Sequence, residues 1–145
     1  MRIIITTNVN QNYKTVFQGF TKTLFLALAP PFPKVNLLRF DGCEKGDQVH
    51  LEIDMIFFKQ RWDADIIESS ERKNEHYFID NGSKLPFFLK TWRHHHRIIG
   101  KENNSTDIVD DFEYTTPFFL FDYLMYPVFY LQFAARSPIY KKVFG

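Results

Sequence analysis

Hydrophobic and polar positions near the N-terminus predict one strand followed by two short helices. Arg2–Val9 is rich in β-branched residues and short, which is typical of a strand. Asn10 offers an N-cap to a first amphipathic helix and Thr21 to a second, and a proline-rich run at residues 30–33 ends the second. The apolar positions at helical spacing are Tyr13, Val16, Phe17 and Phe20 in the first helix, and Leu24, Phe25 and Leu28 in the second.

From Val35 onward the hydrophobic period changes to two, which indicates strands. The segments between them contain Gly, Asn, Asp and Ser, the residues of tight turns. Short connections favour antiparallel neighbours, so we expect a meander. The six strands predicted here are Val35–Phe40, Gln48–Phe58, Gln60–Ser69, His76–Asn81, Phe88–Ile99 and Thr106–Thr115.

The longest apolar segment, Phe118–Arg136, is predicted to be a terminal helix. Pro127 inside it should kink the helix without ending it, because apolar residues resume at once. A bilayer span needs about 20 apolar residues. This run is shorter and contains Asp122 and Gln132, so we expect a core helix and no stable membrane insertion.

Length and charge narrow the class of protein. With 145 residues the chain is the size of one domain, and we assign residues 1–145 to it. The net charge of +1 is too small for binding a phosphate backbone, so we expect no nucleic-acid partner. A single cysteine, Cys43, excludes an internal disulfide, and no signal peptide is evident, so we expect a cytoplasmic protein.

Aromatic residues are the unusual feature of the composition. The chain has 17 Phe, 7 Tyr and 2 Trp, which make up 18% of its residues. Each ring can bury on the order of 150–250 Å². These rings either fill the interior of the domain or surround a cavity that holds a ligand or water.

The order of one strand, two short helices, six strands and a long helix resembles the START-like helix-grip superfamily. This group, also called SRPBCC, includes birch-pollen-allergen-like and polyketide cyclase/dehydrase-like proteins, and the local sequence is similar to a bacterial branch of it. The resemblance implies an α+β fold in which a seven-stranded curved antiparallel sheet grips the C-terminal helix around an apolar cavity. It is specific for fold and weak for activity. The segments that carry it are Phe40–Cys43, Lys84–Lys90, Trp92–Ile98 and Tyr126–Leu131.

Side chains alternate along a strand, which divides the predicted strand Phe88–Ile99 into two faces. Trp92, His94, His96 and Ile98 share one face, and the charged Arg93 and Arg97 share the other with His95. The charged set belongs in water, so the Trp92 face should point inward. By the same alternation Asp110 is an inward carboxylate beside Ile108, Phe112 and Tyr114, and two further strands carry the inward stripes Leu51, Ile53, Met55, Phe57 and Trp62, Ala64, Ile66.

His94, His96 and Asp110 form the candidate polar group, and three roles remain open for it. Two imidazoles on one face can ligate a metal together with a carboxylate, but no further ligand is fixed by local spacing, so we expect no metal and no cofactor. They can act as an acid/base pair, or form the polar end of an apolar pocket. We favour the last role, since pockets usually carry a few orienting polar groups.

We therefore expect a non-enzymatic binding module that encloses a small apolar or amphipathic molecule such as a lipid or an aromatic, polyketide-like metabolite. One alternative is a cyclase/dehydrase-type enzyme that uses His94, His96 and Asp110. Another is a protein that binds a membrane or a partner through Phe118–Phe133. The predicted ligand-binding residues are Met55, Trp62, Phe78, Trp92, His94, His96, Asp110, Phe112, Tyr114, Tyr123 and Tyr130.

Overall fold

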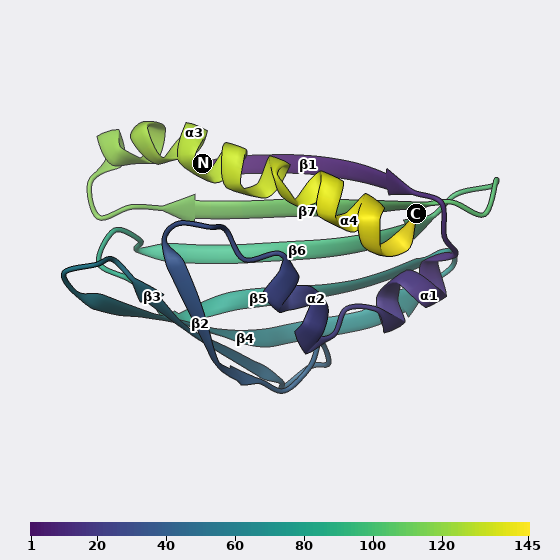
Figure 1. Cartoon of the computed structure of the whole chain (residues 1–145), viewed down its shortest axis with the longest axis horizontal. Helices are drawn as coiled ribbons and strands as arrows, with labels where there is room; N and C mark the ends of the chain where they lie inside the picture. The colour runs from purple at the N-terminus through teal and green to yellow at the C-terminus, as the bar shows by residue number, and fades with distance from the viewer.

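One antiparallel sheet of seven strands organises the structure, a computed structural model that describes residues 1–145 (Figure 1). The strands lie in the order β1-β7-β6-β5-β4-β3-β2, so that only β1 and β7 pair out of chain order. The predicted meander from β2 to β7 is confirmed. The strands are β1 (Arg2–Val9), β2 (Lys34–Phe40), β3 (Gln48–Asp54), β4 (Lys59–Arg72), β5 (Glu75–Lys84), β6 (Thr91–Gly100) and β7 (Thr106–Thr115).

Helices cover the concave face of this sheet, as the helix-grip arrangement predicts. The two short ones, α1 (Tyr13–Gln18) and α2 (Lys22–Ala27), follow β1. The C-terminal pair, α3 (Phe119–Ala134) and α4 (Arg136–Phe144), packs on β1, and α3 also packs on β7 (Figure 1). The α+β fold class with two short helices after the first strand is therefore confirmed.

The predicted N-cap residue is correct for one of the two short helices and wrong for the other. Thr21 caps α2 as predicted, because its hydroxyl accepts a hydrogen bond from the Leu24 backbone N–H. Asn12, not Asn10, caps α1, and its side chain accepts from the backbone N–H of Lys14 at 2.9 Å. Asn10 instead donates its backbone N–H to the carbonyl of Gly145, which ties the end of β1 to the C-terminus.

The strand predicted over Gln48–Phe58 is too long, since β3 ends at Asp54. The Asp54 carboxylate accepts the backbone N–H of Ile56, and Ile56 adopts a left-handed conformation with φ 74°. This turn breaks the alternation and leaves Phe57 93% exposed, so its predicted inward orientation is wrong.

Three further boundaries shift for local reasons. β6 begins at Thr91 rather than Phe88, because the Leu89 backbone N–H bonds to the Pro86 carbonyl in a turn. β4 and β5 extend toward one another until only Lys73 and Asn74 separate them. The two strands then form a single long hairpin, with Asn74 in the left-handed region that tight turns use.

The C-terminal helix is longer than predicted and is divided in two. Pro127 lies inside α3 without ending it, as expected. The break comes at Ala135, after which α4 continues to Phe144 instead of the helix stopping at Arg136. Pro138 explains the division, because it lacks the N–H that would bond to the carbonyl four residues earlier.

The buried apolar residues form two clusters at opposite ends of the concave face. Along β6, Trp92 belongs to the first cluster and Ile98 to the second, while the buried His94 and His96 lie between them. The fold therefore places a polar group between two apolar cores. The first cluster is Ile3, Leu89, Trp92, Phe112, Tyr114, Phe129 and Phe133; the second is Val9, Val16, Leu24, Leu28, Ile98, Ile108 and Tyr140.

The outer side of α3 exposes large apolar side chains, among them Phe119, Leu124 and Leu131. Only Phe129 and Phe133 of this helix are buried. Neither α3 nor any other helix combines the length and the hydropathy required to cross a bilayer. Binding of a membrane or a protein partner by the Phe118–Phe133 surface stays a prediction.

Candidate functional site

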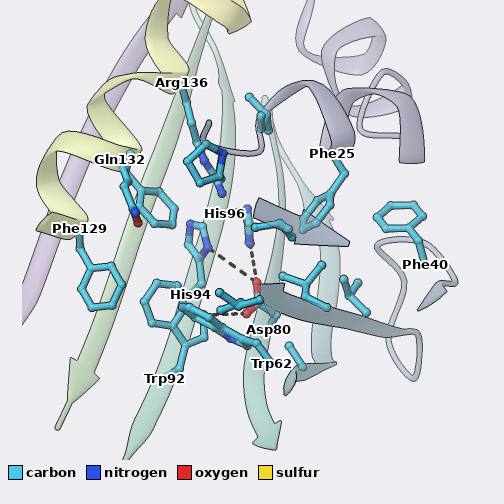
Figure 2. Close-up of a pocket in the computed structure, with 18 of the residues that line it drawn as sticks. Phe25, Phe40, Trp62, Asp80, Trp92, His94, His96, Phe129, Gln132 and Arg136 are labelled. Atoms are coloured by element: carbon cyan, nitrogen blue, oxygen red, sulfur yellow. Dashed lines mark hydrogen bonds and ion pairs between the residues drawn. The ribbon is translucent and has the colours of Figure 1, made fainter. Parts of the chain in front are cut away.

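A cavity of about 580 Å³ lies between the concave face of the sheet and the helices (Figure 2). Of the 33 residues that line it, 24 are hydrophobic. Pockets that hold small molecules have volumes of about 300–1,000 Å³, mostly apolar walls and a few polar groups. The aromatic side chains thus surround a space rather than filling it.

Six residues of the predicted site line this cavity: Met55, Trp62, Phe78, Trp92, His94 and His96. Trp62 and Trp92 meet edge to face with ring centroids 4.8 Å apart and form one wall. Phe78 stacks on the imidazole of His96 at 4.1 Å. The inward orientation predicted for the Trp92 face of β6 is confirmed, because Trp92, His94, His96 and Ile98 are all buried.

The other five predicted site residues lie outside the cavity wall. Asp110, Phe112 and Tyr114 point inward as predicted but are covered, and the Tyr114 hydroxyl donates to the backbone carbonyl of Asp122. Tyr123 and Tyr130 were expected to reach the ligand, which is wrong: they are 66% and 46% exposed on the outer side of α3. The cavity side of α3 is instead formed by Met125, Val128, Phe129, Gln132 and Phe133.

The histidines form the centre of a buried cluster with two aspartates from neighbouring strands. His94 Nε2 lies 2.9 Å from Asp110 Oδ1, and His96 Nε2 lies 2.6 Å from Asp80 Oδ2. Sheet register produces this arrangement, because Asp80 on β5 is opposite His94 and Asp110 on β7 is opposite His96. The two imidazole rings are 3.5 Å apart between centroids.

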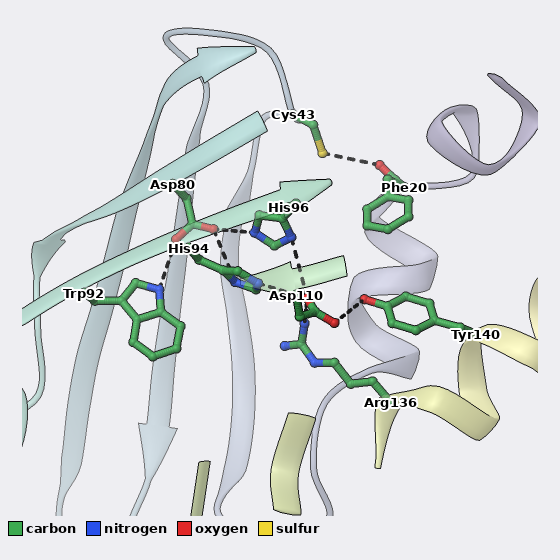
Figure 3. Close-up of polar contacts among 9 residues, drawn as sticks. All are labelled: Phe20, Cys43, Asp80, Trp92, His94, His96, Asp110, Arg136 and Tyr140. Carbon is green, nitrogen blue, oxygen red and sulfur yellow. Dashed lines mark hydrogen bonds and ion pairs between the residues drawn. The ribbon is translucent and has the colours of Figure 1, made fainter. Parts of the chain in front are cut away.

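Each carboxylate of the cluster has further partners (Figure 3). The indole N–H of Trp92 donates to Asp80 Oδ1 at 3.1 Å. On the other side, Arg136 Nη1 lies 3.6 Å from Asp110 Oδ1, and the Tyr140 hydroxyl donates to Asp110 Oδ2 at 3.5 Å. The cluster therefore connects β5, β6 and β7 to the first turn of α4.

Burial and hydrogen bonding set the charges of the cluster. Burial opposes ionisation of Asp110, but the hydrogen bond from His94 and the charge of Arg136 outweigh it and lower the Asp110 pKa to about 2. Burial also opposes ionisation of Asp80, whose pKa is nevertheless lowered by the hydrogen bond from His96. Burial, together with the neighbouring His94, lowers the pKa of His96 to about 4. At neutral pH both carboxylates are charged and His96 is neutral.

Solved structures with the same arrangement of strands and helices share little sequence with this chain. Norcoclaurine synthase from Thalictrum flavum, in complex with dopamine and hydroxybenzaldehyde, matches with a TM-score of 0.66 and 13% identity over 99% of this chain and 85% of its own. Protein Ms6760 from Mycobacterium smegmatis matches with a TM-score of 0.70 and 13% identity over 99% and 90%. The chain has the helix-grip fold of the START-like proteins.

A third helix-grip structure, the Zhui aromatase/cyclase from Streptomyces sp. R1128, matches with a TM-score of 0.60 and 16% identity over 81% of this chain and 69% of its own. No protein-family model and no curated protein matches the sequence. The resemblance inferred from element order is thus confirmed at the level of fold, and identities this low carry no residue roles across.

Three polar residues of the helix-grip cavity were missed by the sequence analysis. Asp80 had a usable signal, since it lies two positions after Phe78 on the same strand and so shares its inward face. Arg136 ends the apolar segment of the sequence, where a charged side chain is typically solvated, but its side chain is only 17% exposed and lines the cavity. Gln132 lies four residues before Arg136 on the cavity side, as Figure 2 shows.

Cys43, in the loop between β2 and β3, also lines the cavity. Its Sγ lies 3.6 Å from the carbonyl oxygen of Phe20, to which the thiol donates. Burial, with smaller contributions from nearby carboxylates, raises the pKa of the Cys43 thiol to about 12. A thiol held in this protonated form is a poor nucleophile.

Proposed function

We propose that this helix-grip domain binds a small apolar or amphipathic molecule in the cavity between the sheet and α3. The observation that carries the proposal is the cavity itself, with its mostly hydrophobic wall and one polar end. Apolar burial is worth about 25 cal/mol per Å², so the aromatic and aliphatic wall would supply most of the affinity. The polar end would orient the ligand.

The nature of the wall supports a ligand with an aromatic or polyketide-like portion. Trp62, Trp92 and Phe129 gather at one end of the cavity, with Trp62 edge-on to both of the other rings. Rings prefer such edge-to-face or offset contacts, which a flat ligand can extend. A polar group of that ligand would meet Gln132, Arg136 or the histidine cluster.

Two neighbouring isoleucines of β4 give a matched test of this proposal. Ile66 is buried and lines the cavity, whereas Ile67, where the β4–β5 register shifts, is exposed and does not line it. A thermal-shift panel of lipids and aromatic metabolites, together with native mass spectrometry of the purified protein, would identify ligands. Ile66→Phe should reduce the ligand-induced rise in melting temperature, and Ile67→Phe should leave it unchanged. Equal responses of the two variants, or no ligand-induced shift at all, would contradict binding in this cavity.

A second candidate function is a cyclase/dehydrase-type reaction, favoured by the Asp110–His94 pair beside the cavity. The Asp110 carboxylate at 2.9 Å can hold the His94 imidazole in one tautomer, so that the other ring nitrogen can accept a proton from a bound substrate. His94→Ala and His96→Ala would each abolish turnover of a candidate substrate in this case. Turnover that survives both substitutions would exclude this mechanism, while ligand binding would be tested separately by the isoleucine pair.

A further inference from the structure

The arrangement of donor atoms around Asp80 suggests a second kind of ligand, additional to the apolar molecule. Asp80, His94 and His96 each offer one ligand atom within 4.8 Å of the others. Two imidazole nitrogens and one carboxylate oxygen form a donor set that Zn²⁺ and Fe²⁺ use in proteins. The sequence analysis considered such a site with Asp110, but the third donor in the structure is Asp80.

The hydrogen bonds determine which nitrogen of His94 is free to bind a metal. An ionised carboxylate only accepts, so His94 Nε2 must carry the proton that it shares with Asp110 Oδ1 at 2.9 Å. In neutral His94 the lone pair is then on Nδ1, which lies 3.8 Å from Asp80 Oδ2. A lone pair that faces a carboxylate in a buried site is unfavourable unless a cation lies between the two.

His96 shows the complementary arrangement. Its Nε2 lies 2.6 Å from the same Asp80 oxygen, while its Nδ1 is buried without a hydrogen-bond partner, 4.0 Å from Asp110 Oδ1. If a metal replaced the proton between His96 and Asp80, that proton would move to Nδ1 and face Asp110. The protonated nitrogen would then face a carboxylate 4.0 Å away instead of presenting a lone pair to it.

We propose that Asp80 Oδ2, His94 Nδ1 and His96 Nε2 bind a divalent transition-metal ion, with Zn²⁺ as the simplest probe. Ligand bonds of about 2.0–2.2 Å place two donors of one tetrahedral ion about 3.4 Å apart. The separations from Asp80 Oδ2, 2.6 Å and 3.8 Å, bracket this value. All three donor atoms lie within 4.8 Å of one another, and side-chain rotation would bring each pair to about this separation.

The hydrogen bonds and close contacts that Asp80, His94 and His96 make with other residues are typical of metal ligands. Histidine ligands usually donate their second N–H to a carboxylate, and ligating carboxylates are themselves hydrogen-bonded. Asp110 is near the second nitrogen of both imidazoles, and the Trp92 indole holds the other oxygen of Asp80 (Figure 3). The cluster contains two carboxylates and one guanidinium, that of Arg136, and this excess of acidic groups around the imidazoles favours a cation.

The three donors line the apolar cavity, so a metal bound there would face the molecule in it. Gln132 and Arg136 line the same cavity and offer hydrogen-bond donors to an oxygen atom of that molecule. The ligand class that this site adds is an apolar molecule with one oxygen donor group, such as a carboxylate or a phenol. Metal binding itself requires no such molecule.

The test uses the purified full chain, freed of metal with a chelator and then titrated with Zn²⁺ by calorimetry and with Co²⁺ by visible absorption. We expect one ion per chain and the ligand-field absorption of Co²⁺ bound to nitrogen and oxygen. His96→Ala should weaken binding by at least 100-fold, and Asp110→Asn, which changes the carboxylate behind His94 and no metal ligand, by about 10–100-fold. His95→Ala is the matched control on the opposite face of β6 and should leave affinity unchanged.

The relative metal affinities of the wild-type chain and these variants decide whether the proposal holds. Failure of the wild-type chain to bind either ion would overturn the proposal, as would an affinity that His96→Ala leaves intact or that His95→Ala reduces as much. Asp80→Asn keeps the size of the side chain and its bond from Trp92, so it decides the question if circular dichroism shows that His96→Ala does not fold. Binding of an apolar ligand in the cavity is measured separately with the Ile66→Phe and Ile67→Phe variants, so its failure can be distinguished from failure of metal binding.

Discussion

The two faces of β6 place three consecutive histidines in opposite settings. His94 and His96 on the concave face are buried between two aspartates. His95 on the convex face is half-buried, with the ring of Tyr77 5.2 Å away and Arg93 and Arg97 on the same side. One residue type therefore serves a buried polar cluster on one side of the strand and a partly exposed outer face on the other.

The adjacent strand repeats this contrast with two aspartates. Asp110 is 2% exposed and faces His94, Arg136 and Tyr140, whereas Asp111 pairs with Arg2 at the surface. Identical groups one residue apart thus differ in solvation and in partners. Substitutions at neighbouring positions can therefore separate the contribution of the cavity side of the sheet to stability from that of the outer side.

The largest effect is expected for Trp92→Ala on the concave face. The indole packs against Trp62, Phe112 and Phe129, and its N–H satisfies Asp80. Removing a buried aromatic ring costs about 3–5 kcal/mol in free energy of unfolding. Urea denaturation should show this loss, while Arg93→Ala, on the exposed side of the same strand, should change stability by less than about 0.5 kcal/mol. Similar losses for the two variants would mean that the faces do not differ as described.

A second test concerns how well the concave side excludes water, and it uses the only cysteine. Because burial raises the Cys43 pKa to about 12, the folded protein contains little thiolate at pH 9, and the rate of alkylation should rise only toward pH 12. In the urea-unfolded chain the rise should come near pH 8.5. At pH 8 the folded protein should react about 10²–10³-fold more slowly, measured with iodoacetamide by mass spectrometry. Equal rates would show that solvent reaches the cavity freely.

The contrast between the faces was predictable from the sequence because it depends only on strand alternation. Trp92, His94 and His96 share a face in any register, and the charges of Arg93 and Arg97 show which face is outside. The order of elements then placed the sheet and helices correctly. Strand alternation does not predict which residue on the adjacent strand lies opposite a given residue.

Pairing of His96 with Asp80 depends on the β5–β6 register. The sequence misplaced both ends of that connection, because β5 runs to Lys84 instead of ending at Asn81, and β6 begins at Thr91 instead of Phe88. Arg136 contacts Asp110 from the first position of α4, just after the break at Ala135 that the sequence analysis did not predict. The helical period alone left the orientation of Tyr123 and Tyr130 open, since α3 is apolar on all sides. Contacts between distant segments thus account for most of what was missed.

A smaller loss is expected for Asp110→Asn. The amide keeps the shape but removes the charge that holds His94, Arg136 and Tyr140 together. Hydrogen bonds to a buried charged group are worth about 1.5–3 kcal/mol, so we expect a destabilisation of about 2–3 kcal/mol by urea denaturation at pH 7. A variant as stable as the wild type would show that the buried charge is not needed to hold α4 on the sheet.

The smallest effect is expected for Asp111→Asn, the neighbour on the convex face. Arg2 donates to both Asp111 oxygens, at 2.9 Å and 2.7 Å, yet its side chain is largely exposed, so water and salt screen the pair. We expect a loss of less than about 1 kcal/mol that shrinks as the salt concentration rises from 0.01 M to 1 M. The Asp110→Asn loss should hardly change over the same range, because its partners are buried. If both losses responded equally to salt, the cluster around His94 would be solvated, and the distinction between the two faces of the sheet would fail.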